Sequence, residues 1–336
     1  MKILHNISLL PYNTFKIDVK CNEFIEYNSL EELISIQKNI QEKFLHIGQG
    51  SNLLFTKDYE GTILHSAIKG IEVISETDSE VILEVGSGEV WDDVVEYCVN
   101  HGYYGTENLS LIPGEMGSAA VQNIGAYGAE VKDVIKYVCA LSHPNGELQT
   151  FNIDECCYSY RNSIFKTDLK GKCFIYKIGL RLSKSFVPKL EYGGLKSYIL
   201  GKGLNPSEIS AKMLRECIIE IRNSKLPDPN RVGNAGSFFM NPVVDYGKYE
   251  ELIAEYPSMP HYAVENGVKI PAGWMIEQCG WKGKSLGNAA AYEKQALVLI
   301  NKGGASGKDV QNLCEAIIND VFNMFGITIK PEVNII

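Results

Sequence analysis

Residues 113–128 read Pro113-Gly114-Glu115-Met116-Gly117-Ser118-Ala119-Ala120-Val121-Gln122-Asn123-Ile124-Gly125-Ala126-Tyr127-Gly128, and this run carries almost no side-chain bulk. Glycine lacks the Cβ atom that blocks positive φ angles, and it leaves backbone N–H groups open to a phosphate or a flavin ring edge. The run therefore predicts that a group other than protein lies close to this backbone.

A second turn of small residues lies upstream. The segment Phe44-Leu45-His46-Ile47 is typical of a buried strand, and Gly48-Gln49-Gly50-Ser51-Asn52 forms the turn that ends it. One such turn is most often an ordinary tight turn, but two in one chain favour a single extended nucleotide cofactor. The fingerprint Gly-x-Gly-x-x-Gly is not met, because Leu53 takes the third glycine position and no helical pattern follows it. A Rossmann domain is therefore disfavoured.

Length and composition favour a multi-domain enzyme. The chain has 336 residues and a net charge of −9, whereas single cores stop growing at about 250–300 residues and nucleic-acid binders need clustered excess Lys and Arg. Nine cysteines include the pair Cys156-Cys157 but no Cys-x-x-Cys pair, so we expect reduced thiols and no metal site. Residues 1–6 do not resemble a signal peptide, and no apolar run approaches the ~18 residues of a membrane span. We therefore expect a cytoplasmic protein that binds neither nucleic acid nor membrane.

The hydrophobic pattern predicts a mixed α+β fold. The spacing of Ser29-Leu30-Glu31-Glu32 is that of a capping box, so a helix leads into the strand at residue 44. Residues 81–85 alternate as a strand, and Gly86-Ser87-Gly88 turns into a helix that bears Trp91. Residues 134–141 and 173–182 are further strands, and a polar loop with Tyr160-Arg161-Asn162-Ser163 separates them.

The second half of the chain predicts a domain boundary. A helix starts at Pro206-Ser207-Glu208 and continues through Ile221, and Pro227-Asp228-Pro229-Asn230 stops it. Beyond this boundary, residues 295–301 predict a strand and residues 306–325 an amphipathic helix that ends before Gly326. Residues 327–329 then extend towards the end of the chain.

Several polar residues are candidates for chemistry. The segment Gly233-Asn234-Ala235-Gly236-Ser237-Phe238-Phe239-Met240-Asn241-Pro242 presents one hydroxyl beside two aromatic rings, although most serines in such runs only hydrogen-bond the backbone. It is not a hydrolase nucleophile elbow, because Gly-x-Ser-x-Gly is absent. On pattern alone Glu332 is a solvated carboxylate near the end of the chain. Side chains that could hold an anion, or lie solvated on the surface, are Arg161, Lys166, Arg222, Lys225 and Arg231.

Taken together, these segments resemble the UDP-N-acetylenolpyruvoylglucosamine reductase (MurB) family. The matches run from Asn13-Thr14-Phe15 to Pro331-Glu332-Val333, which is nearly the whole chain. Glu191-Tyr192-Gly193-Gly194-Leu195 indicates the subgroup whose mobile tyrosine loop closes over the substrate. The other shared motifs are Gly48-Gln49-Gly50-Ser51-Asn52-Leu53-Leu54, Ile112-Pro113-Gly114, residues 122–128, Tyr160-Arg161, Ser163-Ile164-Phe165-Lys166, Lys225-Leu226-Pro227-Asp228-Pro229 and residues 233–239.

The resemblance implies an α+β fold with a two-subdomain FAD-binding module of the vanillyl-alcohol-oxidase (PCMH) type and a C-terminal α+β substrate-binding domain. Residues 1–66 with 331–336 would form the first FAD-binding subdomain, and residues 67–214 the second, with the PCMH-type region at about 17–185. Residues 226–330 would bind the UDP-sugar. Non-covalent FAD would be held by Gly48, Gln49, Gly50, Ser51, Asn52, Ile112, Gly114, Gly117, Ser118, Gln122, Asn123, Gly125 and Tyr127.

The resemblance also implies a reaction. NADPH reduces the FAD and leaves, and the enolpyruvyl UDP-sugar then accepts hydride at the vinyl carbon furthest from its carboxylate, which gives UDP-N-acetylmuramate for peptidoglycan. The implied catalytic residues are Arg161 for the substrate carboxylate, Glu332 for the enolate and Ser237 for proton delivery. Water and Lys225 would tune the hydroxyl of Ser237. The implied substrate-binding residues are Tyr192, Lys225, Asn241, Tyr262, Lys269 and Gln295.

Four positions depart from the family pattern. Glu115 replaces a neutral residue, Asn162 an aspartate, Met240 a lysine and Asn334 a frequent arginine. A carboxylate aimed at the FAD diphosphate would repel it, so we expect the side chain of Glu115 to turn away. Met240 removes one cation, which increases the importance of Lys225.

Two other functions are compatible with parts of this pattern. A flavin oxidase of the same cofactor-binding type would act on an alcohol or sugar, and many such oxidases tether the flavin through His or Cys. The turn at residues 48–52 contains neither, although His46 lies in the strand before it. A non-catalytic UDP-sugar or flavin sensor would need neither Arg161 nor a proton donor.

Overall fold

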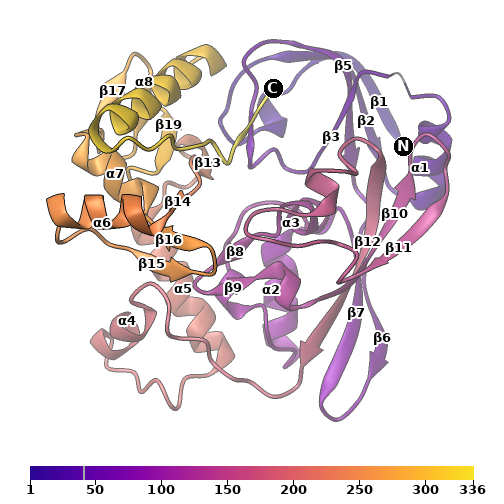
Figure 1. Ribbon diagram of the computed structural model, residues 1–336. Coiled ribbons are helices and arrows are strands. Elements are labelled where there is room, and N and C mark those ends of the chain that lie inside the picture. Colours follow the sequence, from indigo (N-terminus) through magenta and orange to yellow (C-terminus); the bar gives the residue numbers. More distant parts are fainter. Residues whose placement is uncertain (41) are drawn as a thin grey trace. The chain divides into compact units, whose positions relative to one another are not determined.

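A five-stranded sheet holds the core of the first half of the chain. The computed structural model describes residues 1–40 and 42–336, and in it this sheet has the order β11-β10-β12-β7-β6 with antiparallel neighbours (Figure 1). The predicted strands at residues 81–85, 134–141 and 173–182 are confirmed. The strands are β6 (Ile71–Glu76), β7 (Glu80–Gly86), β10 (Ile135–Ser142), β11 (Leu148–Asn152) and β12 (Cys173–Ser183).

Two helices pack against this sheet. The helix α2 (Trp91–Asn100) was predicted, and it buries Trp91, whose Nε1 donates to the carbonyl oxygen of Leu109 at 2.9 Å. The helix α3 (Met116–Gln122) was not predicted, because its small residues were interpreted as a glycine-rich loop. Alanine is the strongest helix former, and Ala119 and Ala120 lie buried in the same apolar cluster as the sheet.

A four-stranded sheet with the order β1-β2-β5-β3 shares a second apolar cluster with the first sheet. Tyr27 and Leu64 of the four-stranded sheet lie in this cluster with Phe174 of β12. Half of the predicted capping box is confirmed, since the Ser29 side chain accepts from the N–H of Glu32, whereas the Glu32 carboxylate accepts from the N–H of Asn28 and not of Ser29. The elements are β1 (Lys2–Ser8), β2 (Lys20–Tyr27), β3 (Phe44–Ile47), β5 (Tyr59–Ser66) and α1 (Leu30–Gln37).

Two further helices form a third apolar cluster, α4 (Leu195–Gly201) and α5 (Ala211–Lys225). The predicted helix start at Pro206 is wrong. Ser210 caps α5 instead, because its Oγ accepts from the N–H of Met213 at 3.2 Å. The predicted stop before Pro227 is confirmed.

The remaining elements are short or belong to the last third of the chain. The predicted helix at residues 306–325 is confirmed, with a Ser306 capping box and Gly326 in the left-handed conformation at its end. The remaining elements are β4 (Leu53–Leu54), β8 (Gly125–Ala126), β9 (Ala129–Glu130), β13 (Gly233–Ser237), β14 (Val243–Val244), β15 (Tyr262–Val264), β16 (Gly267–Lys269), β17 (Ser285–Leu286), β18 (Ala289–Ala291), β19 (Val298–Asn301), β20 (Asn334–Ile335), α6 (Tyr246–Glu255), α7 (Ala272–Gln278), α8 (Gly307–Phe325) and the 3₁₀ turns at Leu10–Tyr12, Glu107–Leu109, Val131–Asp133 and Ile164–Lys166.

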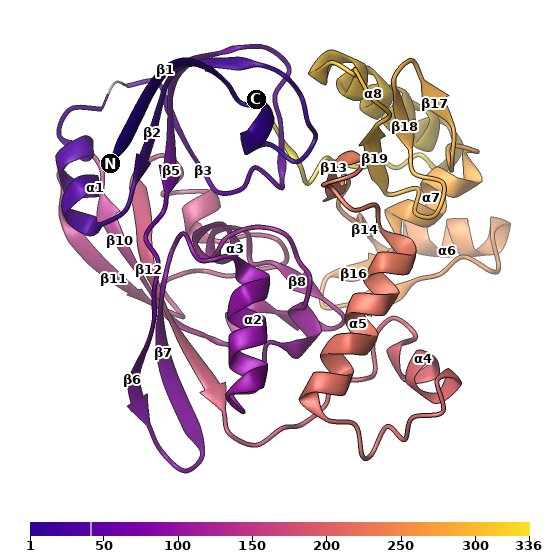
Figure 2. The same ribbon diagram turned by 180° about the vertical axis from the view of Figure 1, so that it is seen from behind.

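The chain divides into two units that interleave in sequence. Unit 1 contains Met1–Ile7, Cys21–Gln49 and Glu60–Ser224, and unit 2 contains Ser8–Lys20, Gly50–Tyr59 and Lys225–Ile336. Unit 2 holds a four-stranded sheet with the order β13-β19-β18-β17, a three-stranded sheet with the order β14-β16-β15, and the pair β4-β20 (Figure 2). The predicted division into three domains is finer than these two units, and it stays a prediction. Within unit 2, Asn334 of β20 pairs in parallel with Leu53 of β4.

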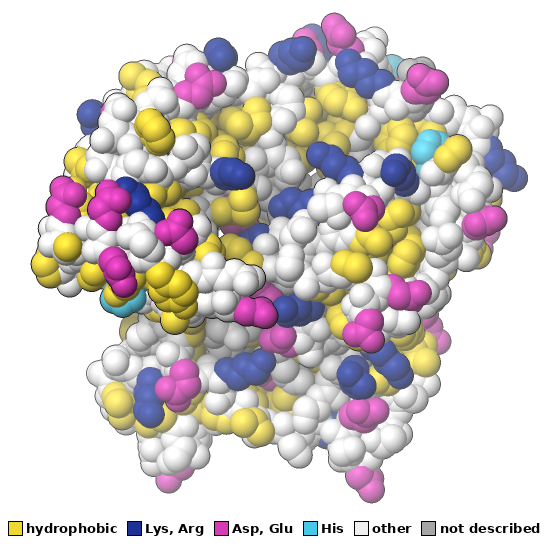
Figure 3. Space-filling view, viewed as in Figure 1, with side chains coloured by type: hydrophobic (Ala, Val, Ile, Leu, Met, Phe, Trp, Pro, Cys, Tyr) yellow, Lys and Arg dark blue, Asp and Glu magenta, His cyan; other side chains and the backbone are white. Residues whose placement is uncertain are grey.

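Charge is spread rather than separated on the surface. Figure 3 shows Lys and Arg side chains interspersed with Asp and Glu over the face that it draws. Among residues 1–40 and 42–336, no helix has both the length and the apolar character that a bilayer span requires.

A buried ion pair joins α5 to α2, and its removal tests the packing of unit 1. The guanidinium of Arg215, a residue that is 8% exposed, donates to both carboxylate oxygens of Asp92 at 2.6 and 3.0 Å. We expect Asp92→Ala to lower the free energy of unfolding by about 3–5 kcal/mol, because it leaves a buried cation without its partner. Asp93→Ala on the exposed side of the same helix should change it by no more than about 0.5 kcal/mol. Denaturant unfolding measures both, and equal effects would contradict the analysis.

Candidate active site

The turn after β3 lies directly against the start of α3 in unit 1. A Cβ atom at Gly48 would be 3.1 Å from Ser118 Oγ and 3.1 Å from Glu115 Oε2. Both distances are shorter than ordinary van der Waals contacts, so the turn approaches α3 this closely only because residue 48 is glycine. Two segments that the sequence predicted to bind one cofactor therefore meet here.

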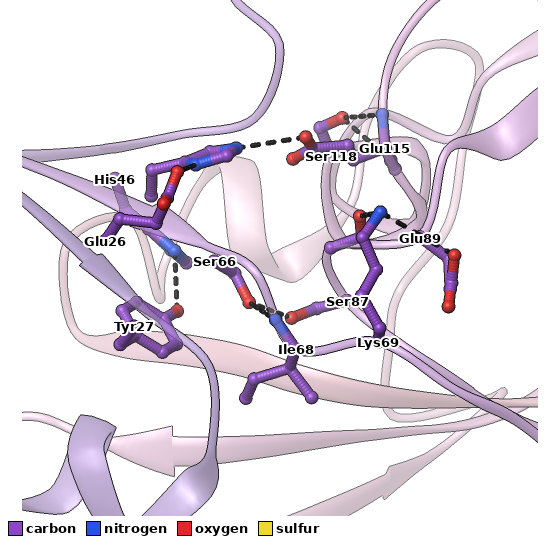
Figure 4. Close-up of polar contacts among 12 residues, drawn as sticks. Glu26, Tyr27, His46, Ser66, Ile68, Lys69, Ser87, Glu89, Glu115 and Ser118 are labelled. Carbon is purple, nitrogen blue, oxygen red and sulfur yellow. Dashed lines mark hydrogen bonds and ion pairs between the residues drawn. The ribbon is translucent and has the colours of Figure 1, made fainter. Parts of the chain in front are cut away.

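The start of α3 is also hydrogen-bonded to the turn that follows β7. The N–H of Gly117 donates to the carbonyl oxygen of Ser87 at 2.8 Å, and the N–H of Met116 donates to that of Glu89 at 2.8 Å. The hydroxyls of Ser87 and Ser66 are hydrogen-bonded at 2.7 Å, which ties this turn to β5 (Figure 4). The serine pair was not singled out in the sequence, because serines in turns carry no pattern of their own.

Glu115 does not turn away from the Gly48 turn, and that expectation is wrong. The residue is 6% exposed, and its Oε1 lies 3.0 Å from His65 Nε2 while its Oε2 lies against Gly48. The second ring nitrogen of His65, Nδ1, lies 3.0 Å from Glu26 Oε2. The negative charge is thus met by a histidine rather than removed to solvent. No signal in the sequence indicated His65, because its partners lie 39 and 50 residues away in the chain.

The loop that carries Arg161 is built onto the end of the glycine-rich run. The guanidinium Nη2 of Arg161 donates to the carbonyl oxygen of Gly125 at 2.6 Å, and a Cβ at Gly125 would lie 2.7 Å from Nη1. Asn123, fully buried and in the left-handed conformation, donates from Nδ2 to the carbonyl oxygen of Ser159 at 2.9 Å. Ser163 Oγ donates to the carbonyl oxygen of Val121 at 2.6 Å. These contacts fix the position of the Arg161 side chain.

The tyrosine loop lies against the same run. A Cβ at Gly128 would be 3.1 Å from the Cβ of Tyr192, whose side chain is 49% exposed. Gly193 and Gly194 both have positive φ angles, of 67° and 74°, and this explains the two glycines after the tyrosine.

Arg222, a half-buried cation, interacts electrostatically with Tyr127. Burial lowers the pKa of Arg222, with the charges of Tyr127 and Asp92 opposing the shift. Its Nε atom is buried and has no hydrogen-bond partner among residues 1–40 and 42–336. Buried donors are almost always paired, so this atom is compatible with an anionic ligand next to Tyr127.

In unit 2, Asn52 of the turn after β3 is hydrogen-bonded to the last residues of the chain. Gly50 has a φ of +66°, and a Cβ there would lie 2.1 Å from the carbonyl oxygen of Tyr12. Asn52 Nδ2 donates to the carbonyl oxygen of Glu332 at 3.3 Å, and the N–H of Asn334 donates back to that of Asn52 at 3.1 Å. Residues 50–52 therefore hold the last strand in place.

The same C-terminal segment pairs with the strand that carries Ser237. The N–H of Glu332 donates to the carbonyl oxygen of Phe238 at 2.8 Å, and the N–H of Met240 donates to that of Lys330 at 2.9 Å. This antiparallel register places Glu332 opposite Phe238, the residue that follows Ser237, in unit 2. Ser237 is exposed and Glu332 is half-buried, so both side chains are accessible to a ligand.

The predicted substrate-binding residues of unit 2 lie near α7 or in the three-stranded sheet. Asn241 Oδ1 accepts from the N–H of Ala272 at 2.9 Å, and Gln295 Oε1 would lie 3.1 Å from a Cβ at Gly273. Tyr262 and Lys269 are directly opposite one another in β15 and β16. Lys225 is exposed at the end of α5. The structure thus brings Asn241 and Gln295 to one helix, and Tyr262 and Lys269 to one hairpin.

The other predicted cofactor residues lie around α3 or in the turn after β3. Ile112 packs against the core of the large sheet, and the carbonyl oxygen of Gly114 accepts from the N–H of Trp91 at 3.0 Å. Gln122 is the last residue of α3, while Gln49 and Ser51 are half-buried in the turn. At Gly48, Gly117 and Gly125 a Cβ atom would lie within a short distance of neighbouring atoms, so the backbone there is closely packed. A backbone surface of this kind fits the site that FAD requires.

Two family models match separate parts of the chain. Residues 24–152 match the family model described as an FAD binding domain, and residues 228–336 match the C-terminal domain of UDP-N-acetylenolpyruvoylglucosamine reductase. Both matches contain segments that we assigned to the site.

Curated relatives and one solved structure cover nearly the whole chain. UDP-N-acetylenolpyruvoylglucosamine reductase of Bacteroides fragilis (strain YCH46) is 53% identical over 98% of this chain and 98% of its own. The same enzyme of Porphyromonas gingivalis (strain ATCC 33277) is 46% identical over all of both chains, and that of Shewanella sediminis is 44% identical over 100% of this chain and 97% of its own. The crystal structure of the enzyme (MurB) from Thermus caldophilus has the same fold, with a TM-score of 0.71 and 20% identity over 100% of this chain and 99% of that one. The chain therefore belongs to the UDP-N-acetylenolpyruvoylglucosamine reductase family.

Proposed function

We propose that this protein is a UDP-N-acetylmuramate dehydrogenase, which reduces UDP-N-acetyl-3-O-(1-carboxyvinyl)-glucosamine to UDP-N-acetylmuramate in peptidoglycan precursor synthesis. NADPH is the electron donor, and non-covalent FAD supplies the hydride. Family membership over the full length supports the activity. The observation that carries the proposal is the register that holds Glu332 opposite Phe238, the residue that follows Ser237.

Arg161 receives the substrate carboxylate. Hydride addition to the vinyl group leaves negative charge on the neighbouring carbon and its carboxylate, which together form an enolate. A cation that is already oriented stabilises such charge without reorganising during the reaction. The bonds of the guanidinium to Gly125 and its position 5.2 Å from the ring centroid of Tyr160 support this role.

Ser237 delivers the proton to the new tetrahedral carbon, and Glu332 assists at the enolate. A serine hydroxyl is a poor acid by itself, so water and Lys225 tune it. The exposure of Ser237 and the hydrogen-bonded main chain of Glu332 support this pairing, because one group reaches the substrate and the other is held in place. The roles of donor and assistant are those that the family resemblance implies.

Binding of the UDP portion involves the remaining candidates. Tyr192, Lys225 and Asn241 contact the diphosphate, and the other contacts to the nucleotide come from Tyr262, Lys269 and Gln295. The enzyme works in the cytoplasm on small molecules and has no nucleic-acid or membrane partner. All nine cysteines of the chain are free thiols in the structure, which supports a reducing compartment.

The purified protein itself provides the first test. We expect a yellow protein that releases intact FAD on denaturation and oxidises NADPH only when the enolpyruvyl UDP-sugar is present. Absorbance of the flavin and of NADPH measures both. Anaerobic reduction of the flavin by an alcohol but not by NADPH would instead identify an oxidase, and a yellow protein that consumes no NADPH would identify a sensor.

Substitution of Lys225 tests the diphosphate contact. We expect Lys225→Ala to raise the Michaelis constant for the UDP-sugar by on the order of tenfold or more, because a hydrogen bond between charged groups is lost. The Michaelis constant should also become less sensitive to salt. Arg231→Ala is the matched control, because it also removes one positive charge and the side chain of Arg231 is 87% exposed. Its Nε lies 3.8 Å from Asp228 Oδ2. Equal effects of the two substitutions would contradict the assignment.

A further inference from the structure

His65 bridges two carboxylates in unit 1. Its Nδ1 lies 3.0 Å from Glu26 Oε2 on β2, and its Nε2 lies 3.0 Å from Glu115 Oε1 at the start of α3. The side chains of His65, Glu26 and Glu115 are 15%, 26% and 8% exposed. Figure 4 shows the two carboxylates of this bridge, Glu26 and Glu115. Solvent therefore screens the bridge only weakly.

This geometry requires a protonated ring. A neutral imidazole has one N–H group, whereas both nitrogens of His65 face a carboxylate, so only the imidazolium donates to both. Burial by itself lowers the pKa of His65, but the hydrogen bond and the charge of Glu115, followed by those of Glu26, outweigh burial and raise the pKa above its usual value.

The other titratable groups near the bridge do not change this. Burial lowers the pKa of His46 on β3 to about 4, so that His46 is neutral at physiological pH. Burial raises the pKa of Tyr27 on β2, which is neutral as well and is hydrogen-bonded to His46 at 2.8 Å. Neither His46 nor Tyr27 therefore adds a charge beside Glu26, His65 and Glu115.

Glu115 connects the bridge to the cofactor turn. The oxygen that does not face His65, Oε2, would lie 3.1 Å from a Cβ at Gly48. Gly48 and Ser118 belong to the residues assigned to FAD, whose diphosphate is an anion. A bare carboxylate in this position would repel the diphosphate, and like charges close together destabilise a complex.

We propose that His65 is a positioning residue for the cofactor, and that its proton neutralises Glu115 behind the Gly48 turn so that the turn retains the FAD diphosphate. The inference rests on the proposed cofactor role of Gly48. It goes beyond that role because it makes retention of FAD depend on His65, a residue of β5 outside the turn.

The sign of the pH dependence follows from linkage. The imidazolium is present below the pKa of His65 and is lost as the pH rises through that pKa, whereupon the charge of Glu115 is no longer balanced. FAD should therefore dissociate more readily at alkaline pH, with the dissociation constant rising by up to about tenfold per pH unit in that window. By the same linkage, bound FAD should raise the pKa of His65.

The test measures the dissociation constant of FAD by dilution of the full-length holoenzyme, using the fluorescence that free FAD gains. In the unsubstituted protein it should rise as the pH passes upward through the raised pKa of His65. Glu115→Gln keeps the shape and an acceptor but not the charge, so it should flatten the alkaline rise and bind FAD more tightly there. His65→Gln should weaken binding by on the order of tenfold, since a neighbouring charge shifts affinity by that amount. The double variant should return to the affinity of Glu115→Gln.

Two comparisons make the outcome decisive. Glu84→Gln removes a half-buried carboxylate that pairs with Lys177 on the large sheet, and it should leave the pH profile unchanged. A rise with pH that persists unchanged in Glu115→Gln would overturn the inference, even where His65→Gln does not fold. If Gly48→Ala binds FAD as the unsubstituted protein does, the cofactor role of the turn fails instead. Weaker binding in Gly48→Ala with an unaltered profile in Glu115→Gln refutes this inference alone.

Discussion

The pairing of the C-terminal segment with residues 238–240 is the constraint on which the proposed chemistry depends. Glu332 uses both its main-chain groups, because its N–H donates to Phe238 and its carbonyl oxygen accepts from Asn52. A slip of one residue in such a pairing would turn the side chain of Glu332 to the opposite face. Three segments far apart in the sequence therefore meet at the main chain of Glu332 in unit 2.

Unit 1 solves a related problem with glycine instead of strand pairing. Gly48, Gly117 and Gly125 each lie where a Cβ would crowd a neighbour, so the backbone of the run is fitted tightly against Ser118, Ser87 and Arg161. Once the unit is folded, this closely packed backbone loses little further entropy when a ligand binds. Its N–H groups already point in fixed directions. A preformed surface of this kind suits a large cofactor that must be held without a covalent bond.

Most of the regular structure could be predicted from the sequence. The helix that was missed and the helix start that was misplaced each have a local cause. Periodic segments such as the helix at residues 306–325 were predicted with their caps, because amphipathic spacing and Ser306 agree. The helix α3 was missed because glycine and serine concealed the helix-forming alanines. The start of α5 was placed too early because Pro206 is a common first helical residue, whereas Ser210 makes the actual cap.

The candidate site was predictable only in part. Ser237 and Arg161 stood out by their motifs, but Glu332 had no signal beyond the family resemblance, since its position depends on long-range pairing with residues 238–240 and 52. The orientation of Glu115 was predicted wrongly because charge repulsion was considered without a partner, and His65 enters from a strand 50 residues away. Spacing within one segment cannot reveal such a partner.

The most direct measurement of the central claim is a double-mutant cycle on Ser237 and Glu332. Reduced enzyme, prepared anaerobically with NADPH, is mixed with the enolpyruvyl UDP-sugar, and the reoxidation rate of the flavin is followed in Ser237→Ala, Glu332→Gln and the double variant. If the two residues act together on one enolate, each single substitution slows the step by about 10²–10⁴-fold and the double variant is scarcely slower. Effects that multiply in the double variant, as for independent sites, would contradict the account.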